Sequence, residues 1–341
     1  MSNNVLSGFE FKAKYGTVFY KVLRSDLIHH GFKYQLGLNV DIQPFNPRGS
    51  CRIGGLYFTD IQHLFNFWDY GKHIALIEIP DDSQIYIEKD KFKADQVIIK
   101  KILDTEIEIL ELLKTDLSKL CSYICPFAAE NGYLEILKWA RKNGYCWHES
   151  ICANAAKNGH METLKWARDH GCPWDSQTCA SAAANGHLET LKWARYNGCP
   201  WNARTCSAAA ANGHLETLKW ARENGCRWDE RTCASAAKND HLEILKWARD
   251  HECSWDERTC AYAAENGHLE TLKWARDHGC PWDYQTCSFA ARNGHLEILK
   301  WARDNGCPWN AQTCTFAAEN GHLEILKWTR ENGCRCGVKY H

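Results

Sequence analysis

Cysteine and histidine recur at fixed intervals in this chain, and both residue types can bind zinc or, for thiols, form disulfides. The 341 residues include 19 cysteines and 16 histidines. One cysteine column is Cys172, Cys199, Cys226, Cys253, Cys280, Cys307 and Cys334, and the other is Cys125, Cys152, Cys179, Cys206, Cys233, Cys260, Cys287 and Cys314. The histidine column is His160, His187, His214, His241, His268, His295 and His322, with Tyr133 in the first unit.

The spacing argues against metal or disulfide chemistry along any column. Stacked helices lie roughly 8–10 Å apart, which exceeds the reach of a disulfide and of a shared metal bond. A link across the two cysteine columns, such as Cys172 to Cys179, stays possible but requires an oxidising environment. We therefore expect thiols buried as small hydrophobic side chains, histidines that bond local backbone, no metal and no cofactor.

Other functional classes are disfavoured by composition and by missing motifs. The chain contains no nucleophile elbow, P-loop or metalloprotease motif, so we expect no catalytic residues. Lys+Arg (41) and Asp+Glu (42) nearly balance, which predicts neither nucleic acid nor membrane as a partner. The first residues lack the features of a secretory signal, and no stretch reaches membrane-spanning length. We expect reduced thiols and a cytoplasmic location.

Tryptophan gives the period of the chain. Successive members of one column are 27 residues apart, and such a period predicts stacked supersecondary units. In one unit, Asp175 caps a short Ala-rich helix, Asn185-Gly186 ends it, and residues 187–195 form a second helix with Gly198 as a left-handed cap. The sequence predicts an α solenoid of 27-residue helix pairs. The column is Trp139, Trp166, Trp193, Trp220, Trp247, Trp274, Trp301 and Trp328.

The two helices of a pair carry side chains of different size. Cys179, Ala182 and Ala183 make a narrow packing face on the first helix, and we expect Ala180 and Ser181, with Gln177 and Ala184, to point away from it. The second helix carries leucine and tryptophan, with solvated pairs such as Glu189 and Lys192 outside. Small residues on one helix and large ones on the other predict a curved array with a concave face of first helices.

A second tryptophan column occupies the loops between pairs. Burying 150–250 Å² of an indole contributes about 4–6 kcal/mol as an upper bound, so these rings are expected to hold neighbouring layers together. The column stops where Cys336 takes the next place. Its members are Trp147, Trp174, Trp201, Trp228, Trp255, Trp282 and Trp309.

The period also predicts the domain boundaries. Residues 105–117 align with the second helix of a pair, with Ile107 at the position of Leu134, and residues 105–120 are expected to be an N-terminal capping half-repeat. Eight repeats fill residues 121–336, and residues 337–341 form a tail. Residues 1–104 lack the period and read as a small α+β domain. The expected strands of that domain are 17–23, 56–58, 73–79, 85–87 and 96–99, with a helix over 60–70 and a turn at 80–83.

Some positions on the first helices differ from repeat to repeat, although most residues of the 27-residue unit recur. These variable positions mark a candidate binding face. Packing does not demand such variation, and exposed aromatic side chains beside arginines are typical of protein interfaces. Neutral drift is the alternative reading. The candidate residues are Arg204, Arg231, Arg258, Tyr262, Phe289, Arg292 and Phe316.

One unit departs from the frame at two glycine positions. Asp240 replaces the glycine between its helices, and Glu252 replaces the capping glycine. If the left-handed conformation is kept, Glu252 costs roughly 1–2 kcal/mol, which makes this unit the expected weak point. A hinge and simple drift both remain open.

The repeated phrase TCxxAAxNGHLExLKWARxxGCPW resembles the ankyrin repeat, and most closely the short, Trp- and Cys-rich repeats of mimivirus-like large DNA viruses. The resemblance implies a scaffold or adaptor for protein–protein interaction, without catalysis. The unit is about six residues shorter than the 33-residue form, and the loss falls in the loop that projects as a β-finger. We therefore expect a protein partner on the concave inner-helix face.

A second resemblance involves the N-terminal domain. His30-Gly31, then Tyr57 in GLYFT, then Asp95 follow the His–Tyr–Glu order of ADP-ribosyltransferase folds. That resemblance implies NAD held by His30 and Tyr57, with Asp95 in place of the glutamate. An ADP-ribosyltransferase-like enzyme domain targeted by the repeats is the alternative function.

Overall fold

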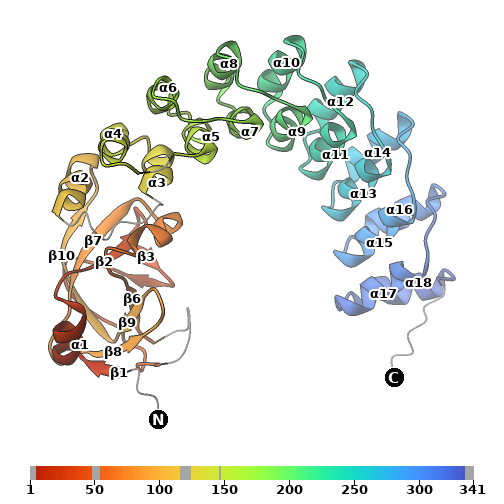
Figure 1. The fold of residues 1–341 in the computed structure, drawn as a ribbon. Coiled ribbons are helices and arrows are strands. Elements are labelled where there is room, and N and C mark those ends of the chain that lie inside the picture. Colours follow the sequence, from red (N-terminus) through yellow and green to blue (C-terminus); the bar gives the residue numbers. More distant parts are fainter. Residues whose placement is uncertain (1–4, 48–53, 116–123, 146, 335–341) are drawn as a thin grey trace. The chain divides into compact units, whose positions relative to one another are not determined.

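The computed structural model describes residues 5–47, 54–115, 124–145 and 147–334. The chain divides into two compact units, residues 1–147 and 148–341. Figure 1 shows strands and a few helices in the first unit and helices alone in the second. The boundaries expected at residues 104 and 120 remain predictions, and the tail 337–341 lies outside the described residues.

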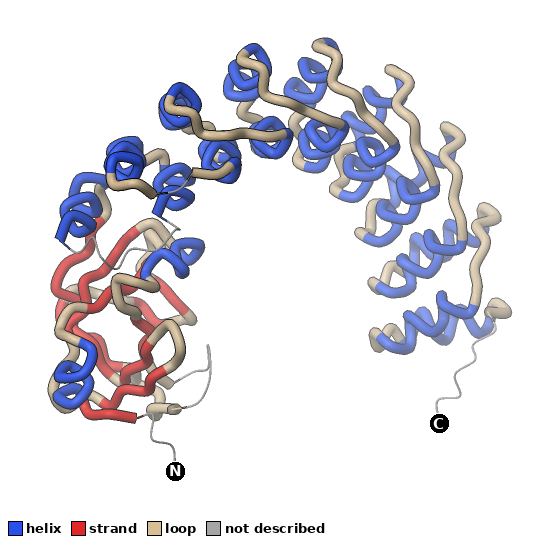
Figure 2. The backbone as a smooth tube through the Cα atoms, in the orientation of Figure 1, coloured by secondary structure: helices blue, strands red, loops and turns tan. Residues whose placement is uncertain are grey.

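Helix pairs follow one another from residue 124 onward, which confirms the predicted solenoid of short helix pairs (Figure 2). The first pair, α3 and α4, belongs to the first unit, and the others belong to the second. The first helices are α3 (Ile124–Asn131), α5 (Glu149–Lys157), α7 (Ser176–Ala184), α9 (Ala203–Ala211), α11 (Glu230–Lys238), α13 (Glu257–Glu265), α15 (Tyr284–Arg292) and α17 (Ala311–Glu319). The second helices are α4 (Leu134–Lys142), α6 (Met161–Asp169), α8 (Leu188–Tyr196), α10 (Leu215–Glu223), α12 (Leu242–Asp250), α14 (Leu269–Asp277), α16 (Leu296–Asp304) and α18 (Leu323–Glu331).

The ends of each helix are set by the capping residues that the sequence predicts. The carboxylate of Asp175 accepts a hydrogen bond from the backbone N–H of Gln177 at 2.9 Å and so caps α7. After α8, Gly198 has a φ of 85°, and the N–H of Cys199 donates to the carbonyl of Ala194 at 3.0 Å. These interactions bound α7 and α8, each of nine residues, and turn the chain into the next element.

First helices of neighbouring pairs in the second unit pack side by side, whereas each second helix mainly contacts its own first helix. Figure 1 shows the first helices along the inside of the curve within this unit. The expectation that Ala180 and Ser181 point away from the packing face was wrong, because their residues are only 3% and 8% exposed. Small side chains let the helix backbones approach closely, so a first helix is buried on both flanks.

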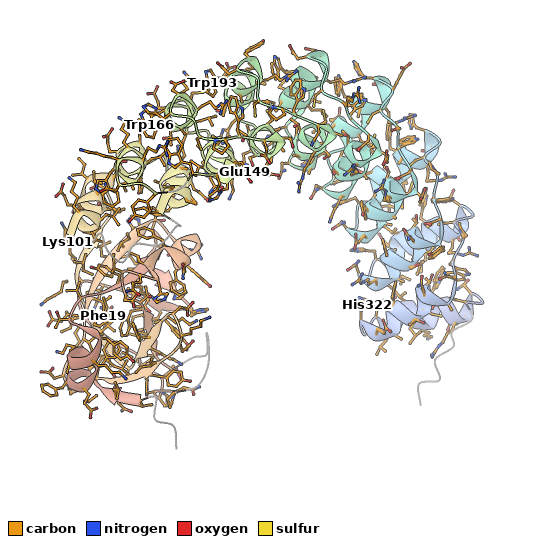
Figure 3. The ribbon with its side chains drawn as sticks, viewed as in Figure 1. Phe19, Lys101, Glu149, Trp166, Trp193 and His322 are labelled. Carbon is orange, nitrogen blue, oxygen red and sulfur yellow. The ribbon has the colours of Figure 1, made fainter. Side chains whose placement is uncertain are left out.

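In the second unit, each loop tryptophan lies between two successive second helices. The Trp228 ring has the Arg222 guanidinium 4.6 Å from its centroid on one side and the Trp247 ring 5.7 Å away, edge-on, on the other. The same arrangement joins Arg168 to Trp174 and Trp193, and Arg249 to Trp255 and Trp274. Figure 3 labels Trp166 and Trp193 on the outer helices α6 and α8. The indoles are half-buried and link adjacent layers, as predicted; Cys336 lies outside the described residues.

The histidine column makes a different contact from the one expected. His295 Nε2 lies 3.1 Å from the carbonyl oxygen of Glu265, at the end of the preceding first helix. A carbonyl only accepts, so Nε2 carries the proton in this bond. The partner therefore belongs to the neighbouring pair and not to the local turn. A Cβ on Gly267 would lie 2.9 Å from the same imidazole ring, so glycine at this turn makes room for the histidine. His214, His268 and His322 bond Ala184, Lys238 and Arg292 in the same way.

The N-terminal part of the first unit contains two four-stranded antiparallel sheets and a short hairpin. The sheet orders are β1-β8-β9-β6 and β2-β7-β10-β5, and β3 pairs with β4. Tyr20 and Thr59 exchange two backbone hydrogen bonds of 2.8 Å, which join the sheets at β2 and β6. The strands are β1 (Val5–Ser7), β2 (Phe19–Leu23), β3 (Ile28–His29), β4 (Phe32–Lys33), β5 (Gly37–Val40), β6 (Leu56–Phe58), β7 (His73–Glu78), β8 (Gln84–Ile87), β9 (Phe92–Ala94) and β10 (Gln96–Leu103).

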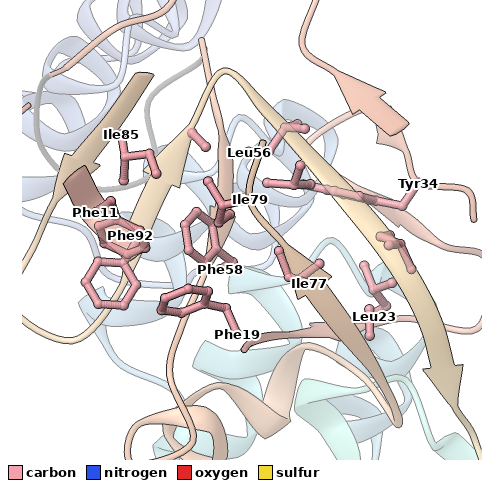
Figure 4. Packing of buried hydrophobic residues seen from close by; sticks show 14 residues of the cluster. Phe11, Phe19, Leu23, Tyr34, Leu56, Phe58, Ile77, Ile79, Ile85 and Phe92 are labelled. Atoms are coloured by element: carbon pink, nitrogen blue, oxygen red, sulfur yellow. The ribbon is translucent and has the colours of Figure 1, made fainter. Parts of the chain in front are cut away.

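An aromatic cluster forms the core between these sheets (Figure 4). Phe11, on helix α1 (Gly8–Tyr15), has its ring centroid 4.9 Å from that of Phe19 and 4.8 Å from that of Phe92. Phe58 meets Phe19 edge-on at 5.5 Å. Helix α2 (Glu106–Thr115) follows β10, buries Ile109 and packs against α4.

The five expected strands coincide with β2, β6, β7, β8 and β10, and Ser83 N–H bonds Pro80 at the predicted turn. The helix expected over 60–70 is instead a turn followed by a 3-10 helix, η1 (Leu64–Tyr70). Helix α1 and the strands β1, β3, β4, β5 and β9 were not predicted from the sequence. These strands are only two to four residues long, and each is defined by its partner strand rather than by a periodicity of its own.

Lys21 is a buried cation in this unit. Its ammonium donates to the carbonyl of Tyr57 at 2.8 Å, lies 3.3 Å from His29 Nδ1 and sits over the Tyr34 ring at 4.7 Å. Burial, and secondarily the charge of Lys91, lower the pKa of Lys21 to about 7.

Restoring glycine at position 252 should stabilise the protein more than restoring it at position 240. Glu252 has a φ of 64° and is exposed, so Glu252→Gly removes backbone strain of about 1 kcal/mol. Asp240 has a φ of 59°, but its carboxylate accepts a 2.6 Å hydrogen bond from Thr271 of the next pair, which Asp240→Gly loses. Denaturant unfolding of both variants measures the difference, and equal stabilisation would contradict this account.

Replacing Lys21 should change how stability depends on pH. The pKa is about 7 in the folded chain and near 10.5 when exposed, so between these values the unfolded chain binds more protons. The free energy of unfolding therefore rises with pH across this window, by up to about 1.4 kcal/mol per unit. Lys21→Met should flatten this rise and stabilise the protein most near pH 7. Unfolding titrations of both proteins from pH 7 to 9 test this, and parallel curves would rule it out.

Candidate functional site

The structure places all seven candidate residues on consecutive first helices. Since these helices pack side by side, the residues lie at three levels of the inner layer of the second unit: an arginine row at the helix starts, an aromatic row in mid-helix, and Arg292 at a helix end. Arg204 lies on α9, Arg231 on α11, Arg258 and Tyr262 on α13, Phe289 and Arg292 on α15, and Phe316 on α17.

Two cations lie close to aromatic rings of the following first helix, between α11 and α13 and between α15 and α17. Tyr262, Phe289 and Phe316 are half-buried. The Lys238 ammonium lies 5.6 Å from the Tyr262 ring centroid, and the Arg292 guanidinium lies 5.8 Å from that of Phe316. In both cases the cation comes from the preceding first helix, so neighbouring helices fix one another's exposed side chains. Lys238 was not among the residues predicted from the sequence; its position in the repeat before an aromatic residue was the available signal.

The arginine row is less cationic than the sequence suggests. Arg258 forms ion pairs with Asp256 at 2.7 Å and with Glu230 at 3.0 Å, and Arg231 pairs with Asp229 at 3.0 Å. Hydrogen bonds to Asp256 and then to Glu230 raise the pKa of Arg258 above its ordinary value. These aspartates also cap their helices, so the guanidinium groups are held close to the helix starts.

Arg204 differs from the other two arginines because Asn202 takes the capping position of its helix. The amide oxygen of Asn202 accepts from the backbone N–H of Arg204 at 3.0 Å but brings no negative charge. Arg204 is exposed. It is therefore the member of the arginine row best placed to meet an external anionic group.

The residues at the position equivalent to Tyr262 are not accessible in every repeat. Ser181 is buried between first helices, and Phe127 is buried in the first unit against Phe65 of η1, with ring centroids 4.9 Å apart. The candidate binding face is therefore the half-buried aromatic run on α13, α15 and α17 with its flanking cations.

Several cavities open among the described residues of the N-terminal unit. One, of about 60 Å³, lies between β2, β6 and η1 and includes Lys21, His29, Tyr57 and Tyr70. Another, of about 300 Å³, includes His29, His30 and Tyr57. His30 and Tyr57, the residues that the resemblance to ADP-ribosyltransferases implies for NAD, thus line the same cavity. Asp95 does not line either cavity; its carboxylate accepts from the backbone N–H of Gln84 at 2.9 Å.

The cysteines of both columns are buried, as predicted. The contact between columns is in a different register from the example Cys172 to Cys179. In the last pair the Sγ atoms of Cys314 and Cys334, twenty residues apart, are separated by 3.2 Å, and Cys233 Sγ lies 4.0 Å from the carbonyl oxygen of Cys253. Across the described part of the chain, no group of three or more His, Cys, Asp or Glu side chains is arranged to hold a metal ion. No helix within that part has the length and apolar character needed to cross a bilayer.

Comparison with known proteins identifies the repeat. The model for ankyrin repeats (many copies) matches residues 260–303 and 287–328. Three proteins of Acanthamoeba polyphaga mimivirus are similar. Ankyrin repeat protein R868 is 28% identical over 40% of this chain and 73% of its own length. Ankyrin repeat protein R229 is 30% identical over 32% of this chain, and the match spans only 40% of its length. The uncharacterized protein R869 is 30% identical over 35% of this chain and 94% of its length.

Among solved structures, the human ASB11 ankyrin repeat domain is similar with a TM-score of 0.39 and 16% identity, covering 46% of this chain and 84% of that domain. The stacked helix pairs, the matching repeat model and the viral relatives agree with one another. These pairs are ankyrin repeats in a shortened form, and the chain belongs to the ankyrin-repeat family.

Proposed function

We propose that this protein is a non-catalytic scaffold that binds a protein partner on the inner-helix face of its repeats. Ankyrin repeats generally mediate protein–protein interactions, which supports the general class of function. The observation that carries the specific proposal is the run of half-buried aromatic rings on α13, α15 and α17, beside Lys238 and Arg292.

The physical argument rests on preorganisation. Rings that already contact a neighbouring cation lose little conformational freedom when a partner covers them, and they offer large apolar area. Aromatic and arginine side chains are the residues that most often dominate binding energy at protein interfaces. The loops are too short for a projecting finger, so the inner helices offer the more extended surface.

The charge distribution favours a protein over a nucleic acid. Positive and negative residues nearly balance in the chain, at 41 and 42, and Arg231 and Arg258 are already paired with carboxylates. A phosphate backbone requires a surplus of positive charge along the binding face. An apolar contact framed by single charges is suited to a folded protein or peptide. We propose a cytoplasmic site of action, where the buried thiols remain reduced.

Replacing Tyr262, Phe289 and Phe316 with alanine should abolish capture of specific partners while helicity is retained. Loss of interface hot spots of this kind typically costs 2 kcal/mol or more each, so capture should fall by at least about 30-fold. Affinity capture with quantitative mass spectrometry compares wild type, the triple variant and Tyr196→Ala. Tyr196 is a matched control because it is a 73% exposed tyrosine on the second helix α8.

Partners that the triple variant no longer captures, but that Tyr196→Ala still captures, support a binding face on α13, α15 and α17. Circular dichroism and thermal unfolding show whether the triple variant is folded. Capture that survives in a folded triple variant would show that the partner binds elsewhere.

The alternative enzyme function has limited support from this geometry. His30 and Tyr57 share a cavity, which favours a ligand site in the N-terminal unit, but Asp95 is engaged between β8 and β9. Incubating the full chain with labelled NAD tests it directly. Label transfer that requires Tyr57 would support the alternative, and an inert wild-type chain would remove it.

A further inference from the structure

The side chain of Lys21 is buried against a cavity of the N-terminal unit. Lys21 is the middle residue of β2 and is 5% exposed. The cavity, of about 60 Å³, lies between β2, β6 and η1. A buried amine costs free energy in mainly apolar surroundings, where packing alone favours a hydrocarbon side chain, so this amine is a candidate for binding chemistry. The aromatic and aliphatic residues of the lining are Tyr20, Val22, Tyr57, Phe58, Phe67 and Tyr70.

Three neighbouring segments hold the Lys21 nitrogen in place. Nζ donates a hydrogen bond of 2.8 Å to the carbonyl of Tyr57 on β6, and it lies 3.3 Å from Nδ1 of His29 on β3. The ring of Tyr34, which follows β4, has its centroid 4.7 Å from Nζ. A nitrogen that is already fixed loses little further conformational freedom when it reacts.

None of these contacts brings a negative charge to Lys21. Among the residues that the structure describes, no carboxylate forms an ion pair with Lys21, whereas Lys100 and Lys101 each have one. The nearby charge is instead positive, because Lys91 lines the same cavity. Burial, and then the charge of Lys91, lower the pKa of Lys21 to about 7. A lysine that is desolvated and close to another cation is the kind that acts as a nucleophile near neutral pH.

His29 brings a second polar group to the same cavity. Burial, and then the charge of Lys21, lower the pKa of His29 to about 4, so its ring is neutral near neutral pH. Nε2 is buried and makes no hydrogen bond within the described part of the chain. When Lys21 donates to Nδ1, Nε2 carries the ring proton and can donate it. An unpaired buried donor costs free energy, which a ligand oxygen placed against it would recover.

We propose that Lys21 is a covalent binding site for short aldehydes, which it holds as an imine. The neutral Nζ attacks the carbonyl carbon, so a C–N bond forms and the C=O double bond becomes a C–OH single bond. The carbinolamine then loses its oxygen as water while the C=N bond forms. In each step the nitrogen gives up one proton to His29 Nδ1, and the oxygen gains one proton from Nε2. Nothing is oxidised or reduced, and hydrolysis reverses the reaction.

The cavity selects a short and mainly apolar aldehyde. A volume of about 60 Å³ holds only a few non-hydrogen atoms. The rings of Phe58 and Phe67 in its lining favour an alkyl chain over hydroxyl or charged groups. Lys91 is already paired with Glu88 at 3.7 Å, so its charge does not require an anionic ligand. Propanal meets these conditions and serves as the probe.

The test incubates the folded full-length chain with propanal and sodium cyanoborohydride, which reduces an imine to a stable secondary amine, and maps modified lysines by peptide mass spectrometry. At pH 7 we expect Lys21 to be modified at least about ten-fold faster than Lys33, because ordinary lysine amines stay protonated at this pH. Lys33 is an exposed lysine on β4 of the same unit. Modification of Lys21 at or below the rate of Lys33 would overturn the proposal.

The rate ratio of the two lysines also depends on pH and on the fold. As pH rises from 7 to 10, the ratio of Lys21 to Lys33 modification should fall, because the amine of Lys21 is already largely neutral while ordinary lysines are still losing their protons. In urea that unfolds the chain, both lysines should react at equal rates. A preference for Lys21 that persists in the unfolded chain would show that the cavity is not its cause.

Two variants separate the nucleophile from its environment. His29→Gln keeps a neutral polar side chain beside Lys21 but cannot pass a proton across a ring, so modification of Lys21 should slow by at least about ten-fold. Lys21→Met should stay folded and should lose the rise in unfolding temperature that propanal gives the wild type. Circular dichroism and thermal unfolding show that both variants are folded. Unchanged modification of Lys21 in folded His29→Gln, or stabilisation of Lys21→Met by propanal, would contradict the proposal.

Discussion

The contrast in side-chain size between the two helix layers is the constraint on which the repeat array depends. On the inside, alanine, serine and cysteine let neighbouring first helices pack in direct contact. On the outside, an indole such as Trp228 fills the space between successive second helices, with a guanidinium on one side and a second indole on the other. A narrow inner spacing and a wide outer spacing produce curvature in a stack of otherwise identical units.

The same constraint determines where recognition can occur. The fully buried positions that contact the next repeat carry small residues in one repeat after another, because a change in one layer would disturb its neighbours. The His295 contact with Glu265 and the small residues of the inner layer belong to this fixed set. The half-buried positions of the first helices vary from repeat to repeat, and Tyr262, Phe289 and Phe316 occupy them. The proposed binding face is built from these variable positions, some of which also contact the neighbouring repeat, as Lys238 contacts Tyr262.

Several inter-repeat contacts could not have been predicted from spacing alone. The histidine was expected to bond its local turn, yet its ring reaches the carbonyl thirty residues back because the two pairs lie so close together. Ala180 and Ser181 were expected to face outward, but the neighbouring first helix covers them. Arg258 was expected to be available to a partner, and Glu230 from the previous repeat pairs with it. In each case the group that contacts the residue belongs to another repeat.

The sequence by itself determined the helix pairs, the caps of their first helices and half of the described strands, because these follow from periodicity and from residues adjacent in the chain. It also identified which positions vary, and therefore which residues belong to the candidate face. Only the tertiary structure decided which cysteines meet, how the arginines are paired, and that Asp95 lies apart from His30 and Tyr57. Those outcomes depend on distances between segments remote in sequence, which local pattern does not encode.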